Sequence, residues 1–223
     1  MKTIVIIGAG PGLGLSIAKK FGANGFQAAL VARNAEKLSL MVYELKALGI
    51  NTKYYVADIS ELPALKAAID AIKHDFGSID VLEFSPYAGP HQFRNVMDTT
   101  PTNVLEQING HLLPAILAVN EWLPDMIQQG AGAILFTTGI SAMQPIPMIG
   151  NVGIVMSGLR NYATNLHNEL KEKGIYVGHL SIGTLIQSGT AGDPDRIADV
   201  WFDMYEKRDH FENVFPEGLF QSN

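Results

Sequence analysis

The chain has 223 residues, with 16 basic and 22 acidic side chains and a formal net charge of −6. With 47% hydrophobic and 17% charged residues it has the composition of a folded protein, and its length fits a single domain spanning residues 1–223. The acidic excess argues against nucleic acid binding, because phosphate contacts require clustered Lys and Arg. The absence of cysteine removes disulfides, thiolate metal sites and cysteine nucleophiles. A strand pattern begins at Thr3, and no apolar run approaches the roughly 18 residues of a membrane span, so we expect a cytoplasmic protein without a signal peptide.

Short β-branched runs alternate with longer helical patterns along the whole chain. Strands are predicted near Thr3–Ile7, Gln27–Ala32, Thr52–Ala57, Val81–Phe84, Ala133–Thr138, Ile175–Ser181 and Asn213–Phe215. Helices are predicted near Gly12–Ala23, Ala35–Leu48, Leu62–Phe76, Pro101–Gln128, Val152–Lys173 and Pro194–Lys207. Thr100 and Asp193 each precede a proline, which is typical of a capped helix start. This alternation predicts an α/β fold, a Rossmann-type doubly wound parallel sheet of about seven strands with helices on both faces.

The first predicted strand runs directly into a glycine-rich turn and then a helix, with residues 4–14 reading I-V-I-I-G-A-G-P-G-L-G. Glycine lets the backbone turn sharply and approach a pyrophosphate, which binds at the positive N-terminus of the helix. The segment therefore predicts a dinucleotide-binding turn; the alternative is a tight turn without a ligand. The residues assigned to this site are Gly8, Gly10, Gly12, Leu13 and Gly14.

The second predicted strand ends in Val31-Ala32-Arg33-Asn34, without the carboxylate that usually binds the ribose hydroxyl of NAD. A guanidinium attracts the 2′-phosphate of NADP and can hold it through two hydrogen bonds. Arg33 and Asn34 are therefore predicted to bind NADP, with NAD the less favoured cofactor. The alternative for Arg33 is an ordinary exposed arginine.

The spacing Gly8-x-x-x-Gly12-x-Gly14, together with later landmarks, resembles the short-chain dehydrogenase/reductase family. The landmarks are Ile79–Leu82, Leu123-Pro124-x-Met126, Gly132-x-Ile134, Leu166-x-x-Glu169-Leu170 and Asp193–Ala198. The resemblance extends from Lys2 to about Gly218. It implies an NADP(H)-dependent oxidoreductase for a small carbonyl or alcohol substrate, assembled as a homo-oligomer (dimer or tetramer).

The resemblance also implies further cofactor contacts. By its match to the family, Asp58 contacts the adenine, although an aspartate after a strand can equally cap the next turn. Further positions assigned to the cofactor by the resemblance are Ile59, Ser85, Asn109 and Gly183.

The catalytic group of the family consists of a Ser after the fifth strand, a Tyr-x-x-x-Lys on the next helix and an Asn in the fourth helix. The lysine lies one helical turn from the tyrosine and stabilises its phenolate. Asn109 matches the asparagine, but Gly139, Val152 and Met156 stand at the serine, tyrosine and lysine positions. An alignment shift does not explain this, because no lysine lies between Lys73 and Lys171.

Other side chains could replace these groups. Tyr87 is a candidate proton donor, with the alternative that it is an ordinary aromatic lining the pocket, and Thr138 or Ser141 could donate a hydrogen bond to a carbonyl. Histidines expected near the site are His91, His111 and His179. We interpret each as structural or solvent-facing rather than catalytic, and their spacing suggests no metal site. Two hypotheses stay open: a reductase with an unusual proton source, and a catalytically inactive dinucleotide-binding sensor or assembly protein.

Overall fold

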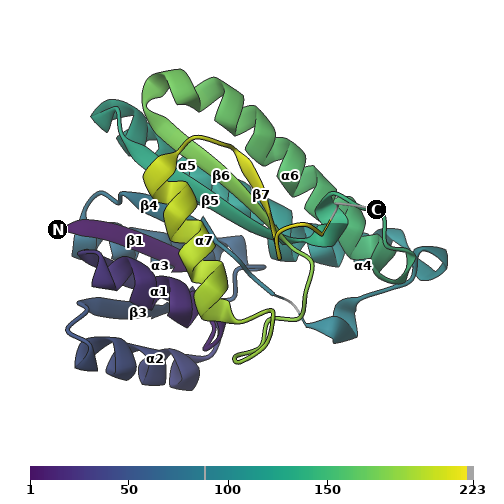
Figure 1. Cartoon of the computed structure of the whole chain (residues 1–223), viewed down its shortest axis with the longest axis horizontal. Coiled ribbons are helices and arrows are strands. Elements are labelled where there is room, and N and C mark those ends of the chain that lie inside the picture. Colours follow the sequence, from purple (N-terminus) through teal and green to yellow (C-terminus); the bar gives the residue numbers. More distant parts are fainter. Residues whose placement is uncertain (88, 220–223) are drawn as a thin grey trace.

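A seven-stranded, entirely parallel sheet forms the centre of the protein in the computed structural model, which describes residues 1–87 and 89–219 (Figure 1). The strands are β1 (Lys2–Ile7), β2 (Phe26–Ala32), β3 (Thr52–Val56), β4 (Val81–Phe84), β5 (Gly132–Gly139), β6 (Ile175–Ile182) and β7 (Glu212–Phe215). Their order across the sheet is β3-β2-β1-β4-β5-β6-β7. This arrangement confirms the predicted doubly wound α/β fold.

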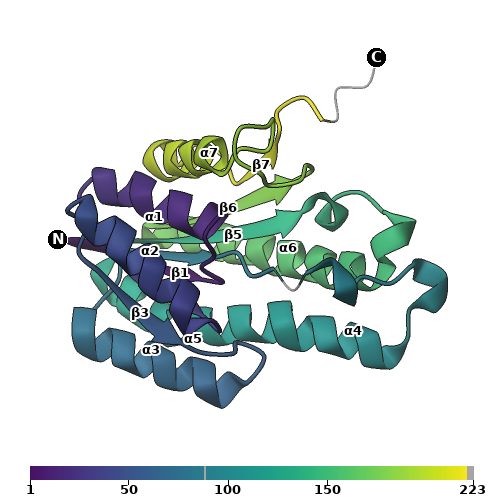
Figure 2. The same ribbon diagram turned by 90° about the horizontal axis from the view of Figure 1, so that it is seen from below.

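Helices cover both faces of the sheet (Figure 2). They are α1 (Leu13–Ala23), α2 (Ala35–Ala47), α3 (Leu62–Phe76), α4 (Pro101–Gln107), α5 (Leu113–Gln129), α6 (Gly150–Leu170) and α7 (Pro194–Lys207). One apolar core lies between the sheet and α1, α2 and α7, and a second lies between the sheet and α3, α5 and α6. Among the described residues, no helix combines the length and apolar character needed to cross a membrane.

The strand order reverses direction between β1 and β4. Ile7, the last residue of β1, pairs with Val31 of β2 on one side and with Phe84 of β4 on the other. The carboxyl ends of these strands therefore meet at one edge of the sheet. In open parallel sheets, ligands bind outside this edge at the point of reversal.

Most predicted elements are confirmed, with ends that differ by one or two residues. Thr100 accepts a hydrogen bond from the backbone N–H of Asn103, and Asp193 accepts one from that of Asp195, so both predicted caps are present. The C-terminal turn of the predicted helix ending at Lys173 is a 3-10 turn. Gly12 is the N-cap of α1 rather than its first helical residue.

The prediction of one continuous helix over Pro101–Gln128 is wrong. A π turn (Ile108–Leu112) separates α4 from α5, and the N–H of Leu113 donates to the carbonyl of Ile108, five residues earlier. Pro114 gives the physical reason, because its ring has no N–H for the carbonyl of Gly110 and would crowd that carbonyl in a regular helix.

Candidate functional site

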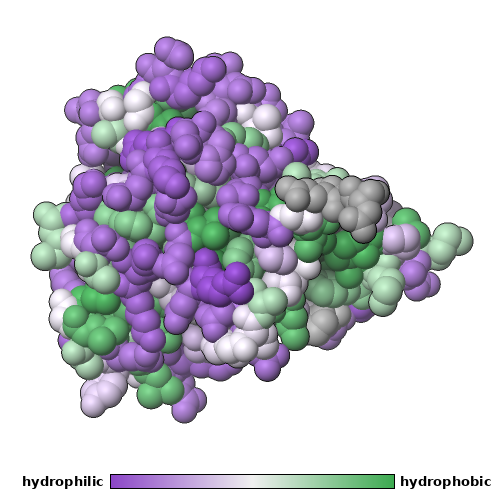
Figure 3. Space-filling view, viewed as in Figure 1, coloured by the Kyte–Doolittle hydropathy of each residue, from purple (hydrophilic) through white to green (hydrophobic). Residues whose placement is uncertain are grey.

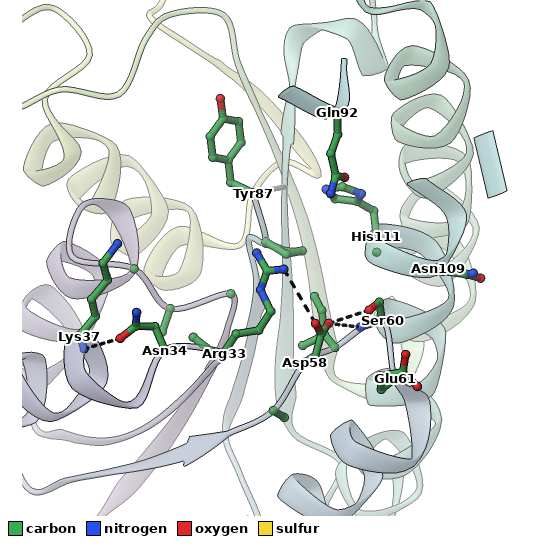
Figure 4. A pocket seen from close by; sticks show the side chains of 18 of the residues that line it. Arg33, Asn34, Lys37, Asp58, Ser60, Glu61, Tyr87, Gln92, Asn109 and His111 are labelled. Atoms are coloured by element: carbon green, nitrogen blue, oxygen red, sulfur yellow. Dashed lines mark hydrogen bonds and ion pairs between the residues drawn. The ribbon is translucent and has the colours of Figure 1, made fainter. Parts of the chain in front are cut away.

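A pocket of about 580 Å³ lies at the carboxyl edge of the sheet (Figure 4). Its size is in the range of cofactor and substrate sites. It is bounded by the turn after β1, the ends of β2 and β3, the loop after β4, and the helical segment from α4 into the π turn. The predicted site residues that it brings together are Gly8, Gly10, Arg33, Asn34, Asp58, Ile59, Tyr87 and Asn109.

The glycine-rich turn is shaped by two close backbone approaches. Gly8 has φ +92°, and a Cβ there would lie 2.5 Å from the Cα of Pro86. At Gly14 a Cβ would lie 2.8 Å from the Cα of Ala9, so α1 packs directly on the turn. A Cβ at Gly10 would meet no protein atom within 4 Å; it would project into free space at the pocket wall. The turn is thus closely packed on the side facing Pro86 and Ala9 and open on the side facing the pocket. The open side has room for a phosphate group against the backbone.

Basic side chains gather at the β2 end of the pocket. Arg33 and Lys37 both line it, and Asn34 caps α2 by accepting a hydrogen bond from the N–H of Lys37 (2.9 Å). The Arg33 Nη1 lies 3.8 Å from Asp58 Oδ2, and 62% of the Arg33 side chain is exposed. This loose, solvated ion pair leaves most of the guanidinium donors available to an anion.

Asp58 takes part in the turn after its strand, which was the alternative given for it beside the adenine contact. Its Oδ1 accepts hydrogen bonds from the backbone N–H (3.0 Å) and the hydroxyl (2.7 Å) of Ser60, which closes the turn after β3. These hydrogen bonds from Ser60 lower the pKa of Asp58, with a smaller contribution from Arg33. The carboxylate still lines the pocket, so its turn-forming role leaves Oδ2 facing Arg33.

Several predicted site residues do not line the pocket. They are Gly12, Leu13, Gly14, Ser85, Thr138, Ser141 and Gly183. Leu13 is buried in the core under α1, and a Cβ at Gly183 would lie 2.4 Å from Leu219 Cδ2, so the chain near its C-terminal end covers this glycine. Ser141 is buried, and its hydroxyl has no hydrogen-bond partner within the described residues.

A buried carboxyl group supports the loop that packs on Gly8. Glu83 lies in β4 with no exposed surface and accepts hydrogen bonds from Ser85 Oγ (2.8 Å) and Thr137 Oγ1 (3.0 Å). Trp201 Nε1 in turn donates to Thr137 Oγ1 (2.9 Å). Burial raises the pKa of Glu83 to about 8, although both hydrogen bonds oppose this rise. Ser85 therefore stabilises the loop after β4 by its hydrogen bond to Glu83, and it does not line the pocket.

Thr138 belongs to a second buried network, on the opposite face of the sheet. Its Oγ1 lies 2.8 Å from His179 Nε2 and 3.1 Å from Ser181 Oγ. His179 Nδ1 lies 2.8 Å from Glu212 Oε1, and Arg160 of α6 binds both carboxylate oxygens of Glu212 (2.6 and 2.7 Å). Burial by itself raises the pKa of Glu212, but the hydrogen bonds from Arg160 and His179 outweigh it and lower this pKa to about 2. The network ties β5, β6, β7 and α6 together.

The two remaining candidates lie at the pocket margin. Tyr87 is 67% exposed, packs edge-to-face against Phe93, and directs its hydroxyl away from Arg33 and Asp58 (Figure 4). The side chain of Asn109 also points away from the other labelled residues (Figure 4). Neither side chain turns toward Arg33 and Asp58 (Figure 4), and this orientation of the exposed Tyr87 fits the alternative of an ordinary aromatic that lines the pocket.

Val152 and Met156 lie one turn apart on α6, where the resemblance places tyrosine and lysine. Both are buried in a small apolar cluster with Ala142, and partly buried Phe93, Met143 and Ile149 pack against it. The cluster offers no proton donor and no cation.

Among the lining residues that the sequence did not assign a binding or catalytic role are Lys37, Gln92 and His111, of which His111 was expected near the site as a structural residue. Lys37 lies in the first turn of a helix that begins beside Arg33, which is a usable signal for a second cation. Gln92 and His111 carry no local signal, because their approach depends on the loop after β4 and on the π turn.

The parallel sheet, the glycine-rich turn at its point of reversal and the pocket at that edge define a nucleotide-binding α/β protein of the Rossmann type. The sequence model of the short chain dehydrogenase family matches residues 2–191. The chain therefore belongs to this family of oxidoreductases.

Individual relatives are distant but cover most of the chain. The oxidoreductase asL5 of Sarocladium schorii is 28% identical over 180 residues, which are 81% of this chain and 70% of that protein. A short-chain dehydrogenase from Rhodopseudomonas palustris superposes with a TM-score of 0.84 at 25% identity, covering 96% of this chain and 97% of its own. A metagenomic short-chain oxidoreductase solved in complex with NADP gives a TM-score of 0.83 at 24% identity, covering 96% and 94%.

Proposed function

We propose that the chain binds NADP(H) in the pocket at the carboxyl edge of the sheet and acts as an oxidoreductase on a carbonyl or alcohol substrate. One observation carries this proposal: the same pocket is lined by the glycine turn, which is open toward it at Gly10, and by two basic side chains that follow β2, Arg33 and Lys37. The NADP complex of the metagenomic relative supports the choice of cofactor.

The roles of the residues follow from their chemistry. The backbone N–H of Gly10 and the N-terminus of α1 would donate to the pyrophosphate, and α1 has no acidic residue in its first turn. Gly8 shapes the turn instead, because its own N–H donates to the carbonyl of Val31 (3.0 Å). Arg33 and Lys37 would hold the 2′-phosphate, whose charge NADH lacks. When bound, the nicotinamide supplies or accepts the hydride.

The test of this assignment is an equilibrium titration of wild type and Arg33→Ala with NADPH and NADH. A charge-assisted hydrogen bond contributes about 1.5–3 kcal/mol, so the substitution should weaken NADPH binding by about tenfold or more. NADH binding should change by less than about twofold, because NADH offers no phosphate to this side chain. An equal loss for both cofactors would contradict the 2′-phosphate role.

A second function is supported by the apolar cluster of Val152 and Met156. We infer from it the alternative of a dinucleotide-binding sensor or assembly protein without turnover, because the cluster holds no acid–base group. Absorbance screening of carbonyl and alcohol substrates at saturating cofactor separates the two functions. Tight binding without any turnover supports the sensor; measurable turnover supports the oxidoreductase.

We also propose a homo-oligomer, a dimer or tetramer, as the working form. Exposed apolar side chains lie on α4, α5 and α6, among them Leu105, Leu113 and Ile154. Figure 3 shows apolar surface gathered toward the end of the molecule where α4 and α6 lie. Light scattering should give a mass of two or four times the 24.2 kDa of one chain, and Ile154→Lys should lower it.

A further inference from the structure

The wall of the pocket opposite Arg33 and Lys37 carries two polar side chains with free hydrogen-bonding groups. They are Gln92, from the turn after β4, and His111, from the π turn. Figure 4 shows both side chains directed toward the same part of the pocket, across from Lys37 and Asn34. Neither has a role in the function proposed above.

Gln107 fixes the orientation of both side chains. The His111 Nδ1–H donates to the backbone carbonyl of Gln107 (3.2 Å), which leaves Nε2 as the free ring nitrogen. The Gln107 side-chain amide donates to Gln92 Oε1 (3.2 Å), and Asn151 donates to the Gln92 backbone carbonyl (3.0 Å). Gln92 is therefore held through both its backbone carbonyl and its side-chain oxygen. Its side-chain N–H groups have no hydrogen-bond partner within the described residues.

The pair consequently offers one acceptor and one donor. Only 5% of His111 is exposed, and burial lowers its pKa, so the ring is neutral at pH 7 and its Nε2 accepts a hydrogen bond. The Gln92 amide donates. A hydroxyl pair on a sugar can satisfy both, because each hydroxyl donates and accepts.

The position of the pair limits which part of a dinucleotide it can meet. The cations at the end of β2 select the nucleoside that bears the phosphate, and the glycine turn lies between the two sides of the pocket. The half of the ligand beyond the pyrophosphate must then extend away from Arg33. On that side, Asn109 points outward and Tyr87 directs its hydroxyl away, whereas Gln92 and His111 turn inward (Figure 4).

We propose that Gln92 and His111 bind the hydroxyl groups of the second ribose, the one that carries the nicotinamide. This inference rests on the proposed NADP(H) binding and adds two residues to it. The π turn is the structural device that makes it possible, because it interrupts the helix where His111 is presented to the pocket.

A series of truncated ligands tests the proposal without any need for turnover. Binding of adenosine 2′,5′-bisphosphate, 2′-phospho-ADP-ribose and NADP is measured by calorimetry for wild type, His111→Ala and Gln92→Leu. Each substitution should weaken 2′-phospho-ADP-ribose and NADP by about two- to tenfold, the value of one hydrogen bond. Binding of adenosine 2′,5′-bisphosphate, which has no second ribose, should be unchanged.

The controls separate this inference from the proposed function. His74→Ala, a substitution of an exposed histidine on α3, should leave all three ligands unaffected. Gln92→Leu replaces a partly exposed side chain by one of similar size, so this variant should fold. Its ligand affinities therefore test the proposal even if His111→Ala does not fold. An equal loss for all three ligands would mean that the pair contacts the adenosine half and would overturn the proposal, as would no loss for any. Failure of wild type to bind any of the ligands would instead overturn the proposed function.

Discussion

Glu83→Gln should make the protein more stable at neutral and alkaline pH. The wild-type carboxyl has a pKa of about 8 in the folded protein and an ordinary value of 4.5 when exposed. Between these values the unfolded chain loses a proton that the folded chain keeps, so the free energy of unfolding falls as pH rises. At about 1.4 kcal/mol for each pH unit, the cost approaches roughly 3 kcal/mol at pH 7 and roughly 5 kcal/mol above pH 8.

Glutamine can preserve the hydrogen bonds of the protonated acid. Trp201 Nε1 donates to Thr137 Oγ1, and the Thr137 hydroxyl donates to Oε1 of residue 83. In the structure the Ser85 hydroxyl donates to the other oxygen, Oε2. A glutamine Nε2 in that place would donate to Ser85 Oγ after the hydroxyl rotates, because a hydroxyl oxygen both donates and accepts. The substitution removes the titration and keeps the contacts of the loop.

Chemical denaturation at pH 5 and pH 8.5 measures the effect. The variant and wild type should differ little at pH 5, and the variant should be more stable at pH 8.5 by up to roughly 5 kcal/mol. Glu172→Gln, at an exposed position, is the matched control and should show no such difference. If the difference between Glu83→Gln and wild type is the same at both pH values, the reasoning about the buried carboxyl is refuted.

Three further substitutions probe the site and the network around it. Lys37→Ala should weaken NADPH by several-fold in a fluorescence titration while leaving NADH unchanged; an equal loss for both would remove Lys37 from the phosphate site. Gly8→Ala should destabilise the fold and weaken dinucleotide binding, since its Cβ would lie 2.5 Å from Pro86; a normal melting temperature would show that the loop moves away freely. Glu212→Gln should lower stability by up to about 3 kcal/mol at pH 7, because a pKa of about 2 in the folded state stabilises the protein above the ordinary value of 4.5. That loss should shrink as pH falls from about 4.5 toward 2, and a loss independent of pH would contradict it.

Sequence periodicity predicts the fold well, because a parallel sheet buries nearly all of its central strands. β1 and β4 read as short buried runs, and the glycine turn after β1 marks the point of reversal. Arg33 could be assigned to the site for the same local reason, since it directly follows β2. Glu83 shows the limit of this reading: a carboxyl within an apolar strand signals an unusual group, but its partner Thr137 lies on another strand.

The interruption of the helix between α4 and α5 explains why the sequence did not predict the position of His111 in the pocket. A continuous 3.6-residue repeat through residues 101–128 does not place His111 relative to the pocket, because the π turn changes the register of every later residue. Pro114 is the signal in the sequence that could have indicated this break. The contact of Gly183 with Leu219 joins segments far apart in the chain, and no local pattern carries it.

The central claim is that the pocket binds a phosphorylated nicotinamide dinucleotide, and a titration of wild-type protein with NADPH tests it most directly. We expect saturable binding, seen in the nicotinamide fluorescence, that adenosine 2′,5′-bisphosphate displaces competitively. Absence of saturable binding at millimolar NADPH would contradict the account and leave the glycine turn as a structural element alone.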